Sequence, residues 1–310
     1  MSNKMATREA YGKKLAMLGE TTDIIVMDAD LSGSTKTGEF AKKFPGRFIN
    51  TGIAEGNMMS TAAGIATTGK TVFASSFAMF AAGRAFEQIR NSICYPKLNV
   101  KIGATHAGIS VGEDGATHQS IEDIALMRSV PNMVVLSPVD QYETYAVLDA
   151  AVKYDGPVYI RLARLPIENI YDENYTFEIG KSHTLADGND VTIIATGIMV
   201  GAALQAVNML KEQGINARLI NMASIKPIDK DAIIKAAKET KAIVTVEEHS
   251  IIGGLGSAVC EVLCECEPVK VKRIGVEDRF GQSGKPELLF EEYGLTAENI
   301  VKQTKILLNK

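Results

Sequence analysis

Cysteine, tryptophan and long apolar runs are scarce or absent in this sequence. Its 310 residues include four cysteines and no tryptophan, and no uninterrupted apolar run reaches the length of about 18 residues that crosses a membrane. The N-terminal segment mixes Arg8, Glu9, Lys13 and Lys14 into its apolar residues and shows no apolar core before a small-residue cleavage site. We therefore expect no membrane span and no export signal, and we expect a cytoplasmic protein.

A strong charge of either sign is also missing. Lysine plus arginine number 33 and aspartate plus glutamate 37, which gives a net charge of −4 and an isoelectric point near 5.7. Such a chain has no overall basic field that would attract nucleic acid or anionic lipid. Cys260, Cys264 and Cys266 are spaced C-x3-C-x-C without a nearby histidine, unlike the paired C-x2-C spacing of zinc sites. We expect reduced thiols and no metal site formed by them.

Short β-rich runs alternate with helical patterns along the chain, which is typical of βα units around a mainly parallel sheet. The expected strands comprise a first set at residues 23–28, 71–75, 99–103, 133–136 and 157–161, and a second set at 191–195, 216–220, 242–246 and 270–275, with helices near 200–212, 229–239 and 254–265. A polar stretch without sustained periodicity separates the two sets. The sequence thus predicts an α/β protein with two doubly wound domains, residues 1–165 and 188–310, joined by a linker at 166–187.

Two glycine-rich strings imitate nucleotide-binding motifs. Residues 64–71, GIATTGKT, match the phosphate-loop pattern, but a helical pattern precedes them and a β-rich run follows, the reverse of the order that a phosphate loop requires. Residues 253–259, GGLGSAV, carry Val259 where a dinucleotide fingerprint needs its third glycine. A tight strand-to-helix turn is the better interpretation there. His249, a few residues earlier, is interpreted as a surface or interface residue and not as a ligand.

The segment 105–118, THAGISVGEDGATH, holds two of the four histidines, three glycines and an acidic pair. It follows a predicted strand at the carboxyl end, where open α/β sheets bind ligands, and its glycines allow the backbone to bend closely around one. Imidazole exchanges protons near neutral pH, so His106 and His118 are candidates for catalysis. The alternative is that both only satisfy loop backbone. Ser120, three residues before Asp123, predicts the start of the next helix.

Glu55 and a group of phenylalanines form two further candidates. Glu55 stands in the first turn of a helix rich in glycine, alanine and methionine that should be buried. A carboxylate at a core edge is either a complement to the helix dipole or a functional group. Four of the ten phenylalanines are Phe73, Phe77, Phe80 and Phe86. Their spacing fits one face of a helix or turn, so the rings either pack in the core or cradle an aromatic ligand.

Together these segments resemble the C-terminal section of transketolase over nearly the whole chain. The most specific parts are the loop GEDGATHQ at 112–119 and the turn IAEGNM at 53–58. Further matching strings are MATREAYGKKL, DADLSGST, FASSFAMFAAGRAFEQIR, GPVYIRLAR and FGQSGKPELLFEEYGLTAENI. The resemblance implies that residues 1–165 bind the aminopyrimidine of thiamine diphosphate. It also implies that the remainder is the C-terminal transketolase domain.

The resemblance implies a role for each matched residue. Glu55 would share a proton with the pyrimidine ring of the cofactor, and Phe77 and Phe80 would stack on that ring. His106 and His118 would face the donor sugar as catalytic residues. The full set implied to bind the sugar phosphate is Arg8, His106, Asp114, His118 and Arg164. Spacing alone leaves Arg161 as a rival of Arg164 for the phosphate.

One motif of the family is missing. Its diphosphate domain carries G-D-G followed by an asparagine, whose oxygens hold Mg²⁺ or Ca²⁺ against the diphosphate. No GDG occurs here, and the nearest string, ADGND at 186–190, lacks the first glycine and a suitably placed asparagine. The resemblance therefore implies a partner: a separate N-terminal transketolase subunit that holds the diphosphate and the metal ion, in an α2β2 assembly.

The implied function is transfer of a two-carbon ketol unit between phosphorylated sugars, for example from xylulose 5-phosphate to ribose 5-phosphate. The alternatives are a subunit similar to 1-deoxyxylulose-5-phosphate synthase, one similar to the β subunit of 2-oxoacid dehydrogenases, and a non-catalytic assembly subunit. The string GISVGEDGATHQ favours transketolase. The joint presence of Glu55, His106, Asp114 and His118 favours an enzyme, because a scaffold needs none of them. The preferred sugars, the role of the C-terminal domain and the oligomeric state of the isolated chain stay open.

Overall fold

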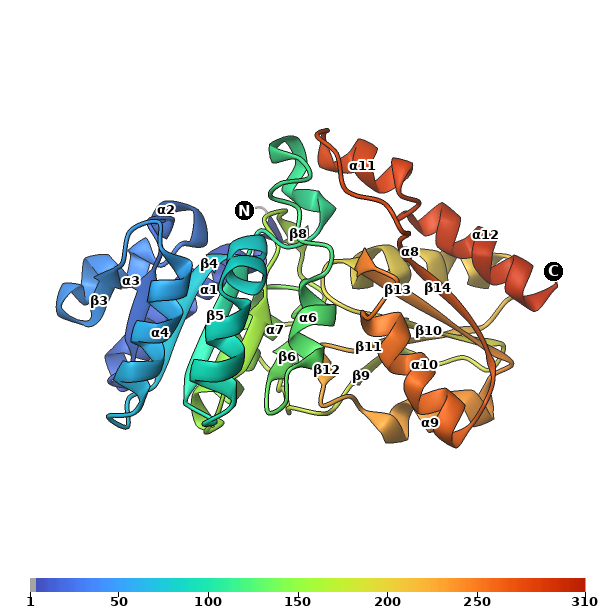
Figure 1. The fold of residues 1–310 in the computed structure, drawn as a ribbon. Coiled ribbons are helices and arrows are strands. Elements are labelled where there is room, and N and C mark those ends of the chain that lie inside the picture. The colour runs from blue at the N-terminus through green and yellow to red at the C-terminus, as the bar shows by residue number, and fades with distance from the viewer. Residues whose placement is uncertain (1–3, 310) are drawn as a thin grey trace.

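The structure is a computed structural model that describes residues 4–309. It contains two α/β units side by side, each built on its own main sheet (Figure 1). The predicted fold class is confirmed. The strand predicted at 191–195 has the predicted bounds, Val191–Ala195, and the other predicted strands are found within a few residues of their expected ends.

The first sheet has seven strands. Their order is β12 (Ser224–Lys226), β6 (Val134–Leu136), β7 (Val158–Arg161), β5 (Val100–Thr105), β4 (Val72–Phe77), β2 (Ile25–Asp28) and β3 (Phe48–Asn50). All neighbouring pairs are parallel except β12 with β6, which is antiparallel. The carboxyl ends of six strands therefore meet at one edge of the sheet.

Helices cover both faces of this sheet, because successive strand residues point to opposite sides. Phe73 packs with α1 (Thr7–Thr21), α3 (Gly38–Lys43) and α7 (Gln141–Lys153) on one face. Val72 and Ala74 pack with α4 (Glu55–Ala66) and α6 (Asp123–Ser129) on the other face. The elements completing this unit are α2 (Ser32–Thr35), α5 (Phe86–Gln88), the π-helical segments Met79–Arg84 and Ile89–Cys94, and the 3₁₀ turns Pro45–Arg47 and Ile109–Asp114.

The second sheet has five strands. Their order is β14 (Lys270–Val276), β13 (Ala242–Ser250), β10 (Val191–Ala195), β11 (Ala217–Asn221) and β9 (His183–Ala186). The helices α8 (Met199–Glu212), α11 (Pro286–Glu292) and α12 (Ala297–Leu308) supply apolar residues to one face, and α9 (Lys230–Glu239) and α10 (Leu255–Cys266) to the other. β9 lies within the range predicted as linker but pairs antiparallel with β11 as an edge strand. The linker region thus contributes to the second sheet.

Two strand pairings join distant parts of the chain. β1 (Lys4–Met5) pairs antiparallel with β8 (Ile167–Glu168). β12 comes from the second half of the sequence but is the edge strand of the first sheet. His249, on β13, is fully buried between the two units, where its Nε2 accepts a hydrogen bond from the backbone N–H of Ile124 at 3.1 Å. It is therefore an interface residue and not a surface one.

Three local predictions can be compared with the structure. The context of GIATTGKT is confirmed, since α4 precedes the turn and β4 follows it. Phe73 lies in β4, as the strand predicted at 71–75 requires, and packs in the core against Tyr11, but the single helical face suggested for Phe73 and Phe86 was wrong. The helix start at Ser120 was also wrong: α6 begins at Asp123 after a residue that provides no side-chain cap. Backbone pairing of Ser120 with Ala107 prevents the earlier start.

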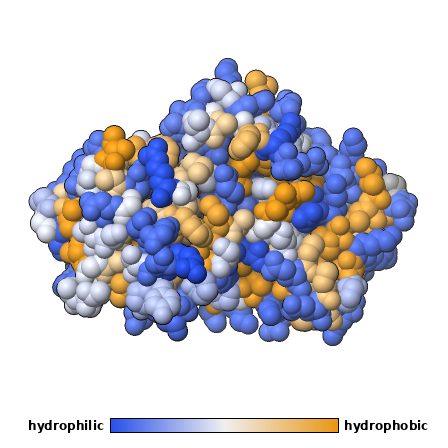
Figure 2. All heavy atoms as spheres, viewed as in Figure 1, coloured by the Kyte–Doolittle hydropathy of each residue, from blue (hydrophilic) through white to orange (hydrophobic). Residues whose placement is uncertain are grey.

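Within residues 4–309, no helix combines the length and apolar character needed to cross a membrane. On the face shown in Figure 2, apolar side chains form separate patches among polar ones.

Candidate active site

The candidate residues gather at the carboxyl edge of the first sheet. Phe77 is the last residue of β4, and its partner in the register, Thr105, is the last residue of β5. His106 follows directly, while Glu55 begins α4 and Arg8 lies in the first turn of α1. Binding sites of open α/β sheets lie at this edge. The parallel register therefore brings together groups that are far apart in the sequence.

Two phenylalanines and two histidines form one stacked cluster. The Phe77 ring lies 3.9 Å from the His106 ring and 5.6 Å from the Phe80 ring, measured between centroids, and both pairs are stacked. His118 meets Phe80 edge-on at 5.3 Å and Phe77 at 6.2 Å. Phe77 is almost fully buried, and Phe80 and His118 are half-buried. The cluster therefore presents aromatic and imidazole faces toward solvent-accessible space.

Glu55 connects to this cluster through a residue that the sequence analysis did not single out. Its side chain is only 4% exposed, and its two carboxylate oxygens lie 3.3 and 3.4 Å from Nη1 of Arg84. The Arg84 guanidinium in turn lies over the Phe80 ring, 4.2 Å from its centroid. Arg84 lies in the string FASSFAMFAAGRAFEQIR, in a π-helical segment, and no pattern in the sequence marked it as a site residue. Glu55 is thus a buried carboxylate next to the aromatic cluster.

His106 has an unusual backbone and a strongly shifted pKa. Its φ of 56° is left-handed, which a non-glycine residue adopts only where surrounding structure enforces it. Nδ1 lies 2.9 Å from the Thr105 hydroxyl and Nε2 lies 3.3 Å from Nη1 of Arg8. Burial, followed by the charges of Arg8 and Arg164, lowers the pKa of His106 to about 3. The imidazole is therefore neutral at physiological pH.

A basic pocket of about 400 Å³ opens beside His106. Its lining includes Arg8, Arg164 and Lys285. Lys285 comes from the second half of the chain and was not among the candidates of the sequence analysis. Burial and the nearby Arg164 lower the pKa of Arg8, with Glu9 acting in the opposite direction. Nε of Arg8 is buried and has no hydrogen-bond partner among the described residues. The three cations, one with an unused donor, outnumber the two carboxylates in the same lining, Glu113 and Glu287, so the hollow suits a phosphate or another anion.

The two competing arginines differ sharply in environment. Arg161 is buried and paired with Asp123, with Nε 3.0 Å from Oδ2, and its Nη2 donates to the carbonyl oxygens of Ser120 and Glu248. Arg164 lines the pocket, is partly exposed, and lies 3.4 Å from a carboxylate oxygen of Asp114. The structure therefore places Arg164, and not Arg161, where a ligand can reach it.

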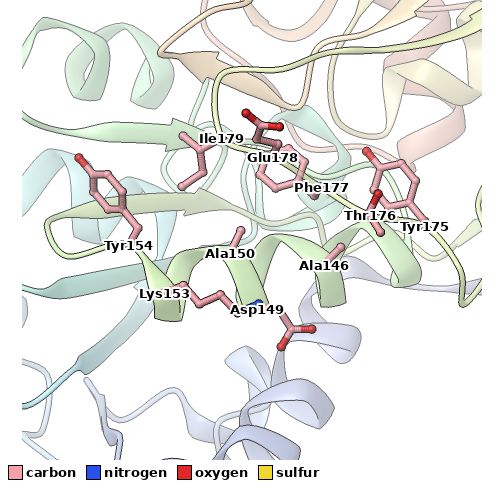
Figure 3. A pocket seen from close by; sticks show the side chains of 10 residues that line it. All are labelled: Ala146, Asp149, Ala150, Lys153, Tyr154, Tyr175, Thr176, Phe177, Glu178 and Ile179. Atoms are coloured by element: carbon pink, nitrogen blue, oxygen red, sulfur yellow. The ribbon is translucent and has the colours of Figure 1, made fainter.

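The described residues contain no metal-binding cluster, and a separate hollow involves none of the candidate residues. Among residues 4–309, no group of three or more His, Cys, Asp or Glu side chains could hold a metal ion. All four cysteines are free. A separate hollow of about 530 Å³ lies between α7 and the segment before β9, and Figure 3 shows its lining side chains, from Ala146 to Ile179. None of the candidate residues lines it.

Family models match both halves of the chain. Residues 3–168 match the transketolase pyrimidine-binding domain, and residues 180–300 match the transketolase C-terminal domain. A protein of Methanocaldococcus jannaschii with the provisional name of transketolase C-terminal section is 57% identical, over 96% of this chain and 94% of that protein.

Two further relatives are named as subunits. The 6-deoxy-6-sulfo-D-fructose transketolase subunit of a Clostridium strain is 44% identical, covering 95% of this chain and 92% of that one. An apulose-4-phosphate transketolase subunit of Phocaeicola vulgatus is 42% identical over 97% of both chains. A solved structure titled as a split-gene transketolase in an inactive β4 tetramer matches with a TM-score of 0.91 and 54% identity, over 98% of each chain. The chain therefore belongs to the transketolase family and joins its pyrimidine-binding and C-terminal domains.

Proposed function

We propose that this chain is the C-terminal subunit of a two-chain transketolase that transfers a two-carbon ketol unit between phosphorylated ketose donors and aldose acceptors. One observation carries the proposal. Three features lie next to one another at one edge of the first sheet: a buried carboxylate, a stacked cluster of aromatic and imidazole rings, and a basic pocket. Each of these three features suits one part of a cofactor and sugar-phosphate complex.

The transketolase family depends on thiamine diphosphate, and the side chains around Glu55 suit the aminopyrimidine ring of this cofactor. Phe77 and Phe80 offer ring faces for stacking. The oxygens of Glu55 make only long contacts with Arg84, so they keep the capacity to accept a shorter hydrogen bond. When bound, this cofactor supplies a carbanion equivalent at its thiazolium carbon. Glu55 would hold a proton on a carboxylate oxygen against a pyrimidine ring nitrogen.

The sugar phosphate would occupy the side of the cluster that His106 and His118 face. Arg8 and Arg164 would bind the phosphate, for which guanidinium groups provide fixed pairs of donors. Nε2 of neutral His106, which accepts from Arg8 in this structure, can instead accept a hydrogen bond from a sugar hydroxyl without a charge change. Asp114, held 3.4 Å from Arg164, would accept a hydrogen bond from a further hydroxyl.

A partner subunit would complete the site. The sequence lacks the G-D-G motif, and residues 4–309 hold no cluster suited to a metal ion. The three relatives described above match over 92–97% of their own length and are named as sections or subunits, and the similar β4 tetramer is titled inactive. We therefore assign the diphosphate and the Mg²⁺ or Ca²⁺ ion to an N-terminal subunit, in an α2β2 assembly.

Reconstitution with that subunit tests the proposal. The complex should convert xylulose 5-phosphate and ribose 5-phosphate, and each chain alone should be inactive. Parallel reactions with sulfofructose and apulose 4-phosphate would identify the sugar, since two relatives are named for these donors. Turnover of pyruvate in place of ketoses would favour a synthase or 2-oxoacid dehydrogenase function. A complex that forms but has no activity on any of these donors would favour an assembly role.

A further inference from the structure

The segment that carries His106, Asp114 and His118 is held by the C-terminal domain. Figure 1 shows the segment after β5 and the region around α11 next to each other, although they lie far apart in the sequence. The 3₁₀ turn Ile109–Asp114 packs against α11. The contacts of this segment, residues 106–120, therefore reveal what the second domain contributes to the site.

Glu248, near the end of β13, makes the most direct of these contacts. Its side chain is buried, and its Oε1 accepts a hydrogen bond from the backbone N–H of Ser110. Gly108 lies against the same carboxylate: a Cβ at this position would be 2.3 Å from the carboxyl carbon. Gly108 also has a φ of 83°, which glycine adopts most readily. The turn after His106 is thus shaped around the Glu248 side chain.

The far end of the segment is connected to Glu248 through Arg161. Nη2 of Arg161 donates to the main-chain oxygen of Glu248 at 2.8 Å and to that of Ser120 at 3.3 Å. Two more contacts come from the chain before α11. Nε2 of Gln119 donates to the Gln282 carbonyl at 2.9 Å, and the Ser283 hydroxyl donates to the Glu113 carbonyl at 2.6 Å. Residues of the second domain therefore hold the segment at its start, middle and end.

Burial of Glu248 has a cost that a purely packing role would avoid. Burial raises the pKa of Glu248 to about 7, with the charge of Arg161 and the Ser110 hydrogen bond acting in the opposite direction. An apolar residue could fill this space without that penalty. The carboxylate makes no contact with the aromatic cluster in the described structure, so any effect on the reaction must pass through the backbone of the segment.

We propose that Glu248 is a positioning residue, whose carboxylate fixes the first turn of the segment 106–120 and thereby places the side chains that face the sugar. This inference rests on the proposed function for the sugar-facing roles of the segment. The contact itself does not, because it is a property of the folded chain.

Glu247 provides a matched control. It precedes Glu248 on β13, is equally buried, and burial likewise raises its pKa to about 7. Its carboxylate accepts from the backbone N–H groups of Leu255 and Gly256 at 2.7 and 2.8 Å, at the start of α10. Replacing either glutamate removes a buried acceptor from the same strand, but only Glu248 touches the segment.

The first test is amide hydrogen exchange on the full chain with Glu248→Ala, Glu248→Gln and Glu247→Ala. In Glu248→Ala, exchange over 106–120 should rise about tenfold, because the Ser110 amide loses its acceptor. Glu248→Gln retains an acceptor oxygen and should stay within about twofold of the natural chain. Glu247→Ala should loosen the start of α10 and leave 106–120 unchanged. Equal exchange of the segment in Glu248→Ala and Glu247→Ala would overturn the proposal.

Gly108→Ala tests the same contact from the opposite side, should Glu248→Ala fail to fold. Its methyl group would collide with the carboxylate, so exchange over 106–120 should rise while the start of α10 stays protected. Unchanged exchange in this variant would contradict the proposed contact.

The second test is steady-state kinetics of the reconstituted two-chain enzyme. Displacement of sugar-facing groups by about 1 Å can reduce kcat/KM for the donor about 10²-fold. We expect that loss in Glu248→Ala, rescue in Glu248→Gln, and a change below about threefold in Glu247→Ala. Faster exchange with an unchanged kcat/KM would overturn the positioning role and leave the contact intact. If the reconstituted enzyme with the unsubstituted chain showed no ketol transfer, the proposed function would be refuted. The exchange test would still show whether Glu248 holds the segment.

Discussion

Replacing Arg161 by glutamine tests the assignment of the two neighbouring arginines. Arg161 is buried, its Nε lies 3.0 Å from Oδ2 of Asp123, and its Nη2 serves two main-chain carbonyls that belong to different domains. The neutral glutamine would leave the Asp123 carboxylate buried without its cation. Asp123 would retain one hydrogen bond, from the Tyr159 hydroxyl at 2.9 Å.

The expected loss of stability follows from this environment. Removing one partner of a buried ion pair costs about 3–5 kcal/mol, because the remaining charge is uncompensated. The Tyr159 hydroxyl keeps the value near the lower end, about 3 kcal/mol. The entropy of unfolding is about 2.1 cal/mol/K per residue, or roughly 0.65 kcal/mol/K for this chain if it unfolds cooperatively. The Tm should therefore fall by about 5 °C.

Urea unfolding and calorimetry of the full chain would measure this change, with Arg164→Gln as the matched control. Arg164 forms a partly exposed pair with Asp114 at 3.4 Å, and such pairs contribute at most about 1 kcal/mol. Its replacement should leave Tm within about 2 °C and raise the KM of the reconstituted enzyme for phosphorylated donors about tenfold. An Arg161→Gln variant as stable as the natural chain, or one that raises KM while Arg164→Gln does not, would refute the reasoning.

Three further outcomes are expected. Glu55→Gln should keep the fold but slow proton exchange at the thiazolium carbon of the reconstituted enzyme by about 10²-fold or more, and an unchanged rate by NMR would remove Glu55 from cofactor activation. Phe80→Ala should weaken cofactor affinity about tenfold, measured by calorimetric titration, because one stacking face is lost. His106 should titrate by NMR near pH 3. Because its charged form is disfavoured on folding, its contribution to stability is complete above about pH 6.5 and is lost as pH falls toward 3, and a midpoint near 6 would contradict its burial.

The sequence predicted those elements whose signal is local. Val191–Ala195 is a short β-rich run, apolar except for Thr192 and buried on both faces, and its bounds were predicted correctly. β9 and β12 were missed because they are short, partly polar edge strands that exist only through pairing with distant strands. Phe73 fell within a correctly predicted strand, but the spacing of the phenylalanines in that strand and in the helical segment after it imitated a single helical face.

The same distinction explains what could be predicted of the site. Residues within quoted motifs, such as Glu55 and His106, lie at the edge where the parallel strands end, as the order of strands and loops indicated. Lys285 and Glu248 were missed because only tertiary structure brings them to the first domain. Arg161 and Arg164 were indistinguishable by spacing, and burial separates them.

Contacts between the first and second domains show why the two cannot be separated without damage to the first. β12 closes the edge of the first sheet beside β6, and Lys226 of this strand donates to the Arg128 and Val130 carbonyls of the first domain. A first domain produced without the second would expose the edge of β6 and leave those carbonyls without their donor. It would also lose the contact of Glu248 with the segment 106–120. The two-chain enzyme that we propose separates only the diphosphate-binding part, whereas the pyrimidine-binding and C-terminal domains share a sheet edge and a loop, and have a physical reason to stay on one polypeptide.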